Sequence, residues 1–128
     1  MQRYEFTKKI GLTEEDISDI LCACIEGGCN YWAQIQNEGE QWDEIEDKLS
    51  NDHTIEDHIM AMWDEGYDLI ILDVEDDVLH CIPFERFLDA IQSVIDDGTW
   101  DGEDVCDVDG IVGDCIMQYA TFGEVIYG

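Results

Sequence analysis

The chain has 128 residues, and its 33 acidic against 5 basic residues give a formal net charge of −28 at pH 7. Hydrophobic residues make up 45% of it, enough for a core, which excludes an acidic disordered tail. The shortage of Lys and Arg excludes a protein that binds nucleic acid through phosphates. The longest aliphatic run, residues 69–72, is far shorter than the roughly 20 residues of a membrane span, and no secretory signal follows Met1. We therefore expect one folded domain, residues 1–128, in the cytoplasm.

The N-terminal part of the sequence predicts one helix with clear ends. Thr13 is a typical N-cap, and the glycines at 27–28 end the segment. Residues 4–10 are predicted as a strand or a pairing arm, and residues 30–35 fit either a strand or the start of a helix. The apolar side chains of the helix recur at amphipathic spacing: Ile17, Ile20, Leu21, Cys24 and Ile25.

Two further helices are predicted before the centre of the chain. Residues 38–51 are strongly acidic but carry apolar residues at helical spacing, which favours a short helix. Thr54 is the expected N-cap of the next helix, and Gly66 ends it. The apolar residues concerned are Trp42, Ile45 and Leu49 in the first helix, and Ile55, Ile59, Met62 and Trp63 in the second.

The centre of the chain predicts an antiparallel hairpin followed by a helix. Residues 67–74 are apolar on both faces, which indicates a central strand, and residues 78–82 follow across an acidic turn. Pro83 suits the first turn of the next helix. The side chains expected to face inward from that helix are Phe84, Phe87, Leu88, Ile91, Val94 and Ile95.

The last part of the chain predicts an acidic loop at 99–108, a helix at 109–122 and an apolar tail at 125–127 that docks on the core. The elements together predict an α+β fold, in which a small antiparallel sheet packs against several amphipathic helices in a single compact domain. The expected seam of the last helix consists of Ile111, Cys115, Ile116 and Tyr119.

Neither the cysteines nor the histidines form a convincing site. The chain has six cysteines but no export signal, so free thiols are expected. No Cys/His spacing fits a structural zinc site, and His53 and His58, five residues apart, would point in different directions on one helix. The acidic segments do not fit a calcium-binding loop. We therefore expect no catalytic residue, no metal site and no cofactor, and we do not expect an enzyme.

Three acidic clusters are the candidate partner-binding surface. A globule of this length is about 36 Å across, a distance over which duplex DNA carries about 21 phosphates. The net charge therefore equals or exceeds that of DNA of the same length. The clusters comprise Glu38, Glu40, Asp43, Glu44 and Asp47; Asp73, Glu75, Asp76 and Asp77; and Asp96, Asp97, Asp101, Glu103 and Asp104.

Aromatic residues are the candidate anchors for a partner. Trp42 and Trp63 lie on apolar helical stripes and are expected in the core. Trp100 lies in the acidic loop and is the best candidate for an exposed anchor. The positions of Tyr31 and Trp32 are left open between core and surface.

Two stretches carry a resemblance to other proteins. Residues 26–32, EGGCNYW, and residues 118–128, QYATFGEVIYG, resemble uncharacterised small acidic proteins of bacteriophages and other mobile elements. The resemblance implies work against a host system in the bacterial cytoplasm, and it implies no activity, cofactor or catalytic residue. In composition alone, the chain is also similar to anti-CRISPR and anti-restriction proteins that mimic DNA.

Two hypotheses follow. In the first, the protein is an anti-defence inhibitor whose DNA-like acidic surface occludes a basic groove of a host nucleic-acid-binding protein, such as a nuclease, a restriction enzyme or a CRISPR effector. In the second, it is a non-mimic adaptor or regulator that uses an apolar patch around Trp100, Tyr31, Trp32 and the C-terminal tail. Neither hypothesis involves direct nucleic-acid or membrane binding, and a homodimer is compatible with both. Adaptation to a salt-rich cytoplasm also produces acidic chains, but the many isoleucines and the cysteines fit it poorly.

Overall fold

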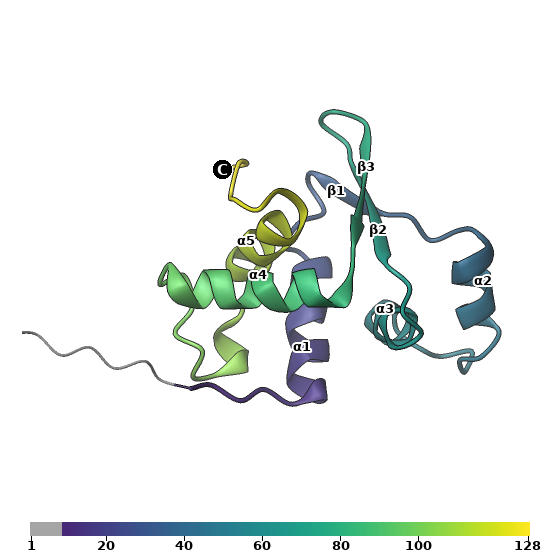
Figure 1. Ribbon diagram of the computed structural model, residues 1–128, viewed down its shortest axis with the longest axis horizontal. Helices are drawn as coiled ribbons and strands as arrows, with labels where there is room; N and C mark the ends of the chain where they lie inside the picture. The colour runs from purple at the N-terminus through teal and green to yellow at the C-terminus, as the bar shows by residue number, and fades with distance from the viewer. Residues whose placement is uncertain (1–8) are drawn as a thin grey trace, which may run out of the picture.

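The computed structural model describes residues 9–128, which form an α+β fold with a three-stranded antiparallel sheet in the order β1-β2-β3 (Figure 1). This confirms the fold class expected from the sequence. Of the predicted N-terminal strand, residues 4–8 lie outside the described residues, and residues 9–10 are not in a strand. The elements are α1 (Glu14–Ile25), β1 (Ala33–Ile35), α2 (Glu40–Glu46), α3 (Ile55–Asp64), β2 (Leu69–Asp73), β3 (Val78–Ile82), α4 (Phe84–Asp96), η1 (Val105–Asp107) and α5 (Gly110–Phe122).

The helix starts follow from local capping. Thr13 Oγ1 accepts from the backbone N–H of Asp16 at 3.1 Å, and the Asp16 carboxylate accepts from the N–H of Thr13 at 2.9 Å. Thr54 and Asp57 form the same capping box at the start of α3. Two otherwise unpaired N–H groups are thus satisfied at each start. Pro83 is the N-cap of α4, one residue outside the helix, where its missing N–H costs nothing.

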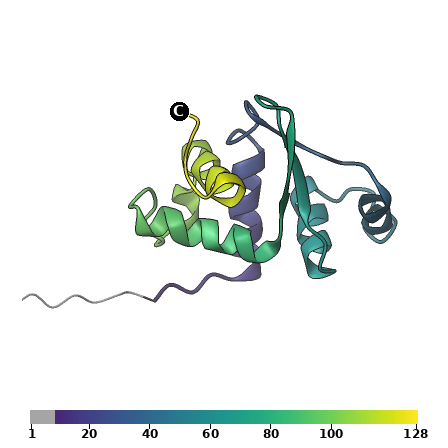
Figure 2. The same cartoon turned by 45° about the horizontal axis from the view of Figure 1, so that its top comes forward.

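The central strand β2 has one covered face. Leu69, Ile71 and Asp73 alternate along that face and are buried, while Ile70 and Leu72 point the other way and are only half-buried. β1 and β3 pair with it on either side, which confirms the predicted central position. The hairpin lies between the α1, α4 and α5 group and helix α2 (Figures 1 and 2). Within residues 9–128, no helix is both long and apolar enough to cross a bilayer.

The apolar residues form two clusters of different size. The main core joins α1, α3, α4, α5 and the covered face of the sheet, with Trp32 and Phe87 among its largest fully buried side chains. A small second cluster of Trp42, Ile45 and Met62 joins α2 to α3. Helix α2 is therefore attached to the rest of the molecule mainly through α3.

Two residues expected to face inward are exposed. Ile111, assigned to the seam of α5, is 76% exposed, and Leu88 of α4 is 39% exposed. Helix α5 carries apolar residues on more than one face, so the spacing of these residues did not identify which face is buried. Ile116 of the predicted seam is buried as expected, and the buried face also includes Val112 and Gly113, which were not predicted.

Gly113 sets how closely α5 approaches α1. A Cβ placed on it would lie 2.9 Å from the Ala23 carbonyl oxygen and 2.9 Å from both N and Cα of Cys24. All three atoms belong to the backbone of α1, so no side-chain rotation relieves the contact. The two helices therefore pack backbone to backbone at this position.

We expect Gly113→Ala to destabilise the protein. Alanine gains about 1 kcal/mol of helix propensity over glycine, whereas crowding of a packed core costs about 1–3 kcal/mol. Because the crowded atoms are backbone, the crowding cost is expected to exceed the gain and to lower the midpoint of urea unfolding. Gly11→Ala is the matched control, since a Cβ there meets nothing within 4 Å. A G113A variant as stable as the parent would contradict the close packing of α1 on α5.

Candidate functional site

The acidic clusters lie on the surface with one exception. Every candidate carboxylate predicted for partner binding is exposed apart from Asp73, which is fully buried. Asp73 lies on the covered face of β2, where its carboxylate accepts from the N–H of Glu75 at 3.0 Å and from the hydroxyl of Tyr127 at 2.7 Å. Its inclusion in the partner-binding surface was therefore wrong. Its burial depends on the C-terminal tail, which local sequence does not reveal.

The three clusters occupy separate parts of the molecule. The first lies on α2 and the residues that flank it, the second at the tip of the β2–β3 hairpin, and the third begins at the last residue of α4 and continues into the loop. Figure 1 shows α2 and the C-terminal end of α4 at opposite ends of the long axis, with the hairpin tip projecting between them. The fold therefore does not gather the clusters into one patch.

The third cluster gains carboxylates from α1 that sequence reasoning missed. Glu14, Asp96 and Asp101 line one hollow of about 1070 Å³, together with Lys9 and with apolar residues such as Ile91 and Leu88. Asp19 of α1 is likewise close enough to η1 to raise the pKa of Cys106, after the larger effects of Asp104 and Asp107. No local signal joins residues 14–19 to residues 96–107; only the packing of α1 beside η1 does.

Few cations neutralise these carboxylates. Between residues of the described part of the chain, Lys48 makes the Lys or Arg ion pairs, with Nζ 3.8 Å from Glu44 and 3.5 Å from Glu65. Both pairs are exposed and contribute little to stability. The formal charge of the surface is therefore almost entirely uncompensated.

Tyrosine hydroxyls take the place of the missing cations. Tyr31 donates to Asp114 at 2.6 Å, Tyr119 to Asp97 at 2.5 Å and Tyr127 to Asp73 at 2.7 Å. Tyr67 donates to Glu44 in the same way. The hydrogen bond to Asp73, with partial desolvation, raises the pKa of Tyr127 to about 12, so its hydroxyl stays protonated at neutral pH.

The acidic loops are held in fixed shapes by their own backbone. Carboxylate oxygens accept from the N–H two residues later at Asp76, Asp97, Asp101 and Asp104, at 2.8–3.1 Å. Such turns order a loop without a cation. The exposed thiol of the acidic loop is Cys106, whose pKa is raised chiefly by the charge of Asp104, which disfavours the reactive thiolate. All six cysteines are free, as expected.

The tryptophan candidates for exposed anchors are buried. Trp100 is 3% exposed, and its Nε1 donates to the Asp104 carbonyl at 3.0 Å, so it packs beneath the acidic loop instead of projecting from it. Trp32 is fully buried, and its Nε1 donates to Asp114 at 2.7 Å. The assignment of Trp100 as an exposed anchor was therefore wrong, and Trp32, whose position was left open, belongs to the core and not to an exposed apolar patch. Tyr31 remains 53% exposed.

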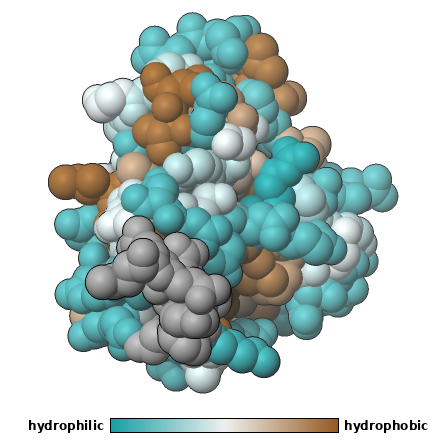
Figure 3. Space-filling view, turned by 60° about the vertical axis from the view of Figure 1, so that its left-hand side comes forward, coloured by the Kyte–Doolittle hydropathy of each residue, from teal (hydrophilic) through white to brown (hydrophobic). Residues whose placement is uncertain are grey.

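Exposed apolar side chains gather beside the C-terminus. Tyr31, Ile111 and Val125 line one open hollow with the C-terminal Gly128, and each is at least 43% exposed. Figure 3 shows apolar atoms in separate patches within a largely hydrophilic surface. The predicted docking of the tail holds for Tyr127, which packs on Trp32, but Val125 and Ile126 stay exposed.

The two stretches that carry the phage-protein resemblance pack together. Gln118 donates from Nε2 to Asp114 at 3.1 Å, and its Oε1 accepts from the N–H groups of Ile126 and Tyr127 at 2.8 Å. Asp114 in turn binds the side chains of Tyr31 and Trp32. Residues 26–32 and 118–128 thus form one hydrogen-bonded unit that fixes the tail.

The prediction that the histidines point apart was wrong. His53 lies in the connection before α3, not on the helix, and its ring centroid is 5.3 Å from that of His58. His58 is buried under Trp42, with ring centroids 3.6 Å apart. The two imidazole rings lie close together because the chain turns between His53 and His58. The spacing of the two residues in the sequence does not reveal this turn.

Comparisons of the chain with protein-family models, with curated proteins and with solved structures find no match.

We expect the Tyr127–Asp73 hydrogen bond to stabilise the protein well into alkaline pH. Because the pKa of Tyr127 is raised, its contribution is complete below the ordinary phenol pKa of about 10 and is lost as pH rises through about 12. Urea unfolding of wild type and Tyr127→Phe at a series of pH values should show a constant difference below about pH 10 that shrinks towards pH 12. A difference already gone near pH 10 would contradict the raised pKa.

We also expect salt to stabilise the protein. Mutual repulsion among uncompensated carboxylates opposes the compact state, and the Debye length falls from about 10 Å at 0.1 M to about 3 Å at 1 M salt. The Tm should therefore rise from low to high NaCl, and equally in KCl, because screening does not depend on the cation. A Tm that stays flat over this range would show that the repulsion is small.

Proposed function

We propose that the protein is a phage-type anti-defence inhibitor whose acidic surface occupies a basic nucleic-acid-binding groove of a host nuclease, restriction enzyme or CRISPR effector. The observation that carries the proposal is a folded surface of formal charge −28 on which nearly all candidate carboxylates are exposed. Repulsion of this size destabilises the fold, whereas solubility requires a net charge of only about 2–8 in a small domain. A cationic partner would offset that cost in the complex.

The order of the acidic loops supports the proposal. Asp97, Asp101 and Asp104 are each held by a backbone N–H within the loop, and Trp100 packs beneath it. Carboxylates fixed before binding lose little entropy on binding, as do the phosphates of a duplex. Arginine side chains of a partner can then bind them bidentately, as they bind phosphate.

The third cluster, enlarged by α1, is the proposed primary contact. Asp96 and Asp101 line one hollow with Glu14 and the cation Lys9. Asp97 and Asp104 are exposed in the same loop as Asp101. The first and second clusters lie elsewhere on the molecule, so they act in long-range steering or contact a groove that wraps around the protein. Fast association that slows steeply with salt is expected in either case.

A second candidate function rests on the apolar patch of Tyr31, Ile111 and Val125. As an adaptor or regulator the protein would bind its partner there, and the acidity would only steer the encounter. Such a complex would survive high ionic strength, because burial of apolar surface is not screened by salt.

The test captures partners from a bacterial lysate on the immobilised full chain, at low and at high salt. The proposal predicts a nucleic-acid-binding protein that salt releases and that duplex DNA displaces in competition. A partner that stays bound in high salt and ignores DNA would overturn mimicry and favour the adaptor function.

Matched charge variants then locate the contact. Asp96→Asn with Asp101→Asn removes two charges from the third cluster while each Asn oxygen still accepts the hydrogen bond from Gln92 or from the N–H of Glu103. We expect weaker binding of the captured partner by about tenfold or more, since hydrogen bonds to charged groups contribute about 1.5–3 kcal/mol. The control, Glu85→Gln with Asp89→Asn, removes two exposed charges of α4 outside the clusters. Equal weakening by both pairs would indicate net charge rather than the third cluster.

A further inference from the structure

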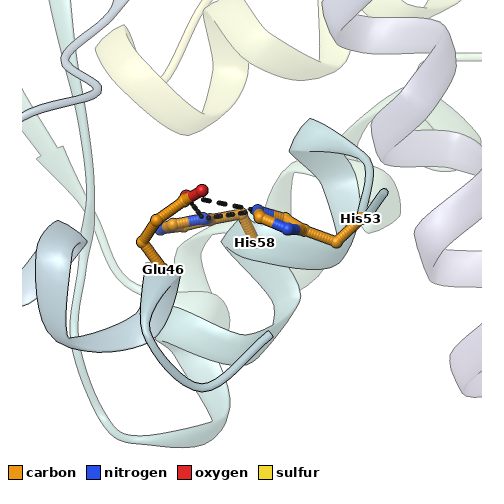
Figure 4. A group of neighbouring side chains, drawn as sticks. All are labelled: Glu46, His53 and His58. Atoms are coloured by element: carbon orange, nitrogen blue, oxygen red, sulfur yellow. Dashed lines mark hydrogen bonds and ion pairs between the residues drawn. The ribbon is translucent and has the colours of Figure 1, made fainter. Parts of the chain in front are cut away.

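Three side chains outside the three acidic clusters converge on one point. His53 Nε2 lies 3.2 Å from His58 Nδ1, and the Glu46 carboxylate Oε2 lies 3.3 Å from the first and 3.1 Å from the second (Figure 4). Glu46 is the last residue of α2, His53 lies in the connection and His58 is in the first turns of α3. The triangle thus joins the two helices.

The hydrogen bonds on the far side of each ring fix the tautomers. His53 Nδ1 lies 2.5 Å from the Ser50 carbonyl oxygen, and His58 Nε2 lies 3.2 Å from the Trp42 carbonyl oxygen. A carbonyl oxygen only accepts, so both of these nitrogens carry a hydrogen. In neutral imidazoles the two nitrogens that face each other are therefore bare lone pairs, and a carboxylate oxygen adjoins both.

Three electron-rich atoms this close together repel one another unless a cation, either a proton or a metal ion, lies among them. A backbone carbonyl that holds the second imidazole nitrogen is the usual support of a histidine that binds a metal. A tetrahedral Zn²⁺ with bonds of about 2.0–2.1 Å holds its ligand atoms about 3.3–3.4 Å apart. The three observed separations of 3.1, 3.2 and 3.3 Å are close to this value.

We propose that Glu46, His53 and His58 bind a divalent transition-metal ion, Zn²⁺ being the best match, and that this ion ties α2 to α3. Two imidazoles and one carboxylate suit zinc, whereas Mg²⁺ and Ca²⁺ prefer oxygen ligands alone. The His58 side chain is 1% exposed and that of His53 11%, but that of Glu46 is 52% exposed. The ion reaches the site from the Glu46 side, where water completes its coordination.

The surroundings hold the ligands in place. The Trp42 ring stacks on His58 with an interplanar angle of 17°, and the Thr54–Asp57 capping box fixes the start of the helix that carries it. The apolar packing of helix α2 rests mainly on the small cluster of Trp42, Ile45 and Met62. A metal bound at its end would add a second attachment. This inference does not depend on the proposed inhibitor function.

The test uses the full chain, stripped of metal by EDTA, with its thiols kept reduced. Zn²⁺ is titrated by calorimetry, and Co²⁺ by visible absorption, which reports tetrahedral coordination. We expect one ion per chain, a higher Tm with Zn²⁺, and a Co²⁺ spectrum without the thiolate charge-transfer band that cysteine ligands would produce. A thiolate band, or the absence of stoichiometric binding, would overturn the proposal.

Paired variants separate this site from general attraction of cations to an acidic surface. Glu46→Gln and His53→Gln should each weaken Zn²⁺ binding by at least about tenfold and reduce the rise in Tm. Glu85→Gln, an exposed glutamate of α4, and His80→Gln, a half-buried histidine of β3, are the matched controls and should bind as wild type. His80 also tests a competing group with Asp73 and Asp76.

If the His53→Gln variant fails to fold without metal, the Glu46→Gln variant is the deciding measurement, because the Glu46 side chain is exposed. Wild-type affinity in Glu46→Gln, or a loss of affinity in His80→Gln as large as in Glu46→Gln, would overturn the assignment.

Discussion

Carboxylates in this protein have few cations to pair with, so their hydrogen bonds come from neutral donors. Asp114 is the clearest case: it accepts from the Tyr31 hydroxyl, the Trp32 indole and the Gln118 amide. A partly buried charge is costly unless it is hydrogen-bonded, and three donors offset that cost here. The same solution recurs with single tyrosines at Asp73 and Asp97. The C-terminal tail and the acidic loop are both fixed through these bonds.

Most elements of the molecule share one core, whereas helix α2 is attached separately. The main core holds α1, α3, α4, α5 and the sheet together, and Gly113 lets α5 lie directly on the backbone of α1. Helix α2 stands apart, joined to α3 by a small apolar cluster and by the triangle of Glu46, His53 and His58. Helix α2 carries most of the first acidic cluster. A metal ion bound by the triangle would therefore influence the position of these carboxylates more than that of the other clusters.

Features fixed by neighbouring residues could be predicted from the sequence, whereas those fixed by distant contacts could not. The N-caps Thr13 and Thr54 and the hairpin of β2 and β3 depend on residues a few positions apart, and they were predicted correctly. Trp100 was assigned to the surface because its neighbours are acidic, yet its indole N–H has an acceptor within its own loop. Asp73 was misassigned because the chain end that covers it lies 54 residues away. The two histidines were missed because a turn, and not helical spacing, brings them together.

The open face of the sheet has a consequence for how copies of the protein meet in solution. Leu79 is 58% exposed there, and Leu72, directly across the ladder, is half-buried. An uncovered apolar surface of this kind favours contact between identical chains. Long-range repulsion between chains of charge −28 opposes such contact near neutral pH. This repulsion weakens as the pH approaches the isoelectric point of about 4.1. Close to that pH, the exposed sheet face is where self-association of the folded chain would be expected to begin.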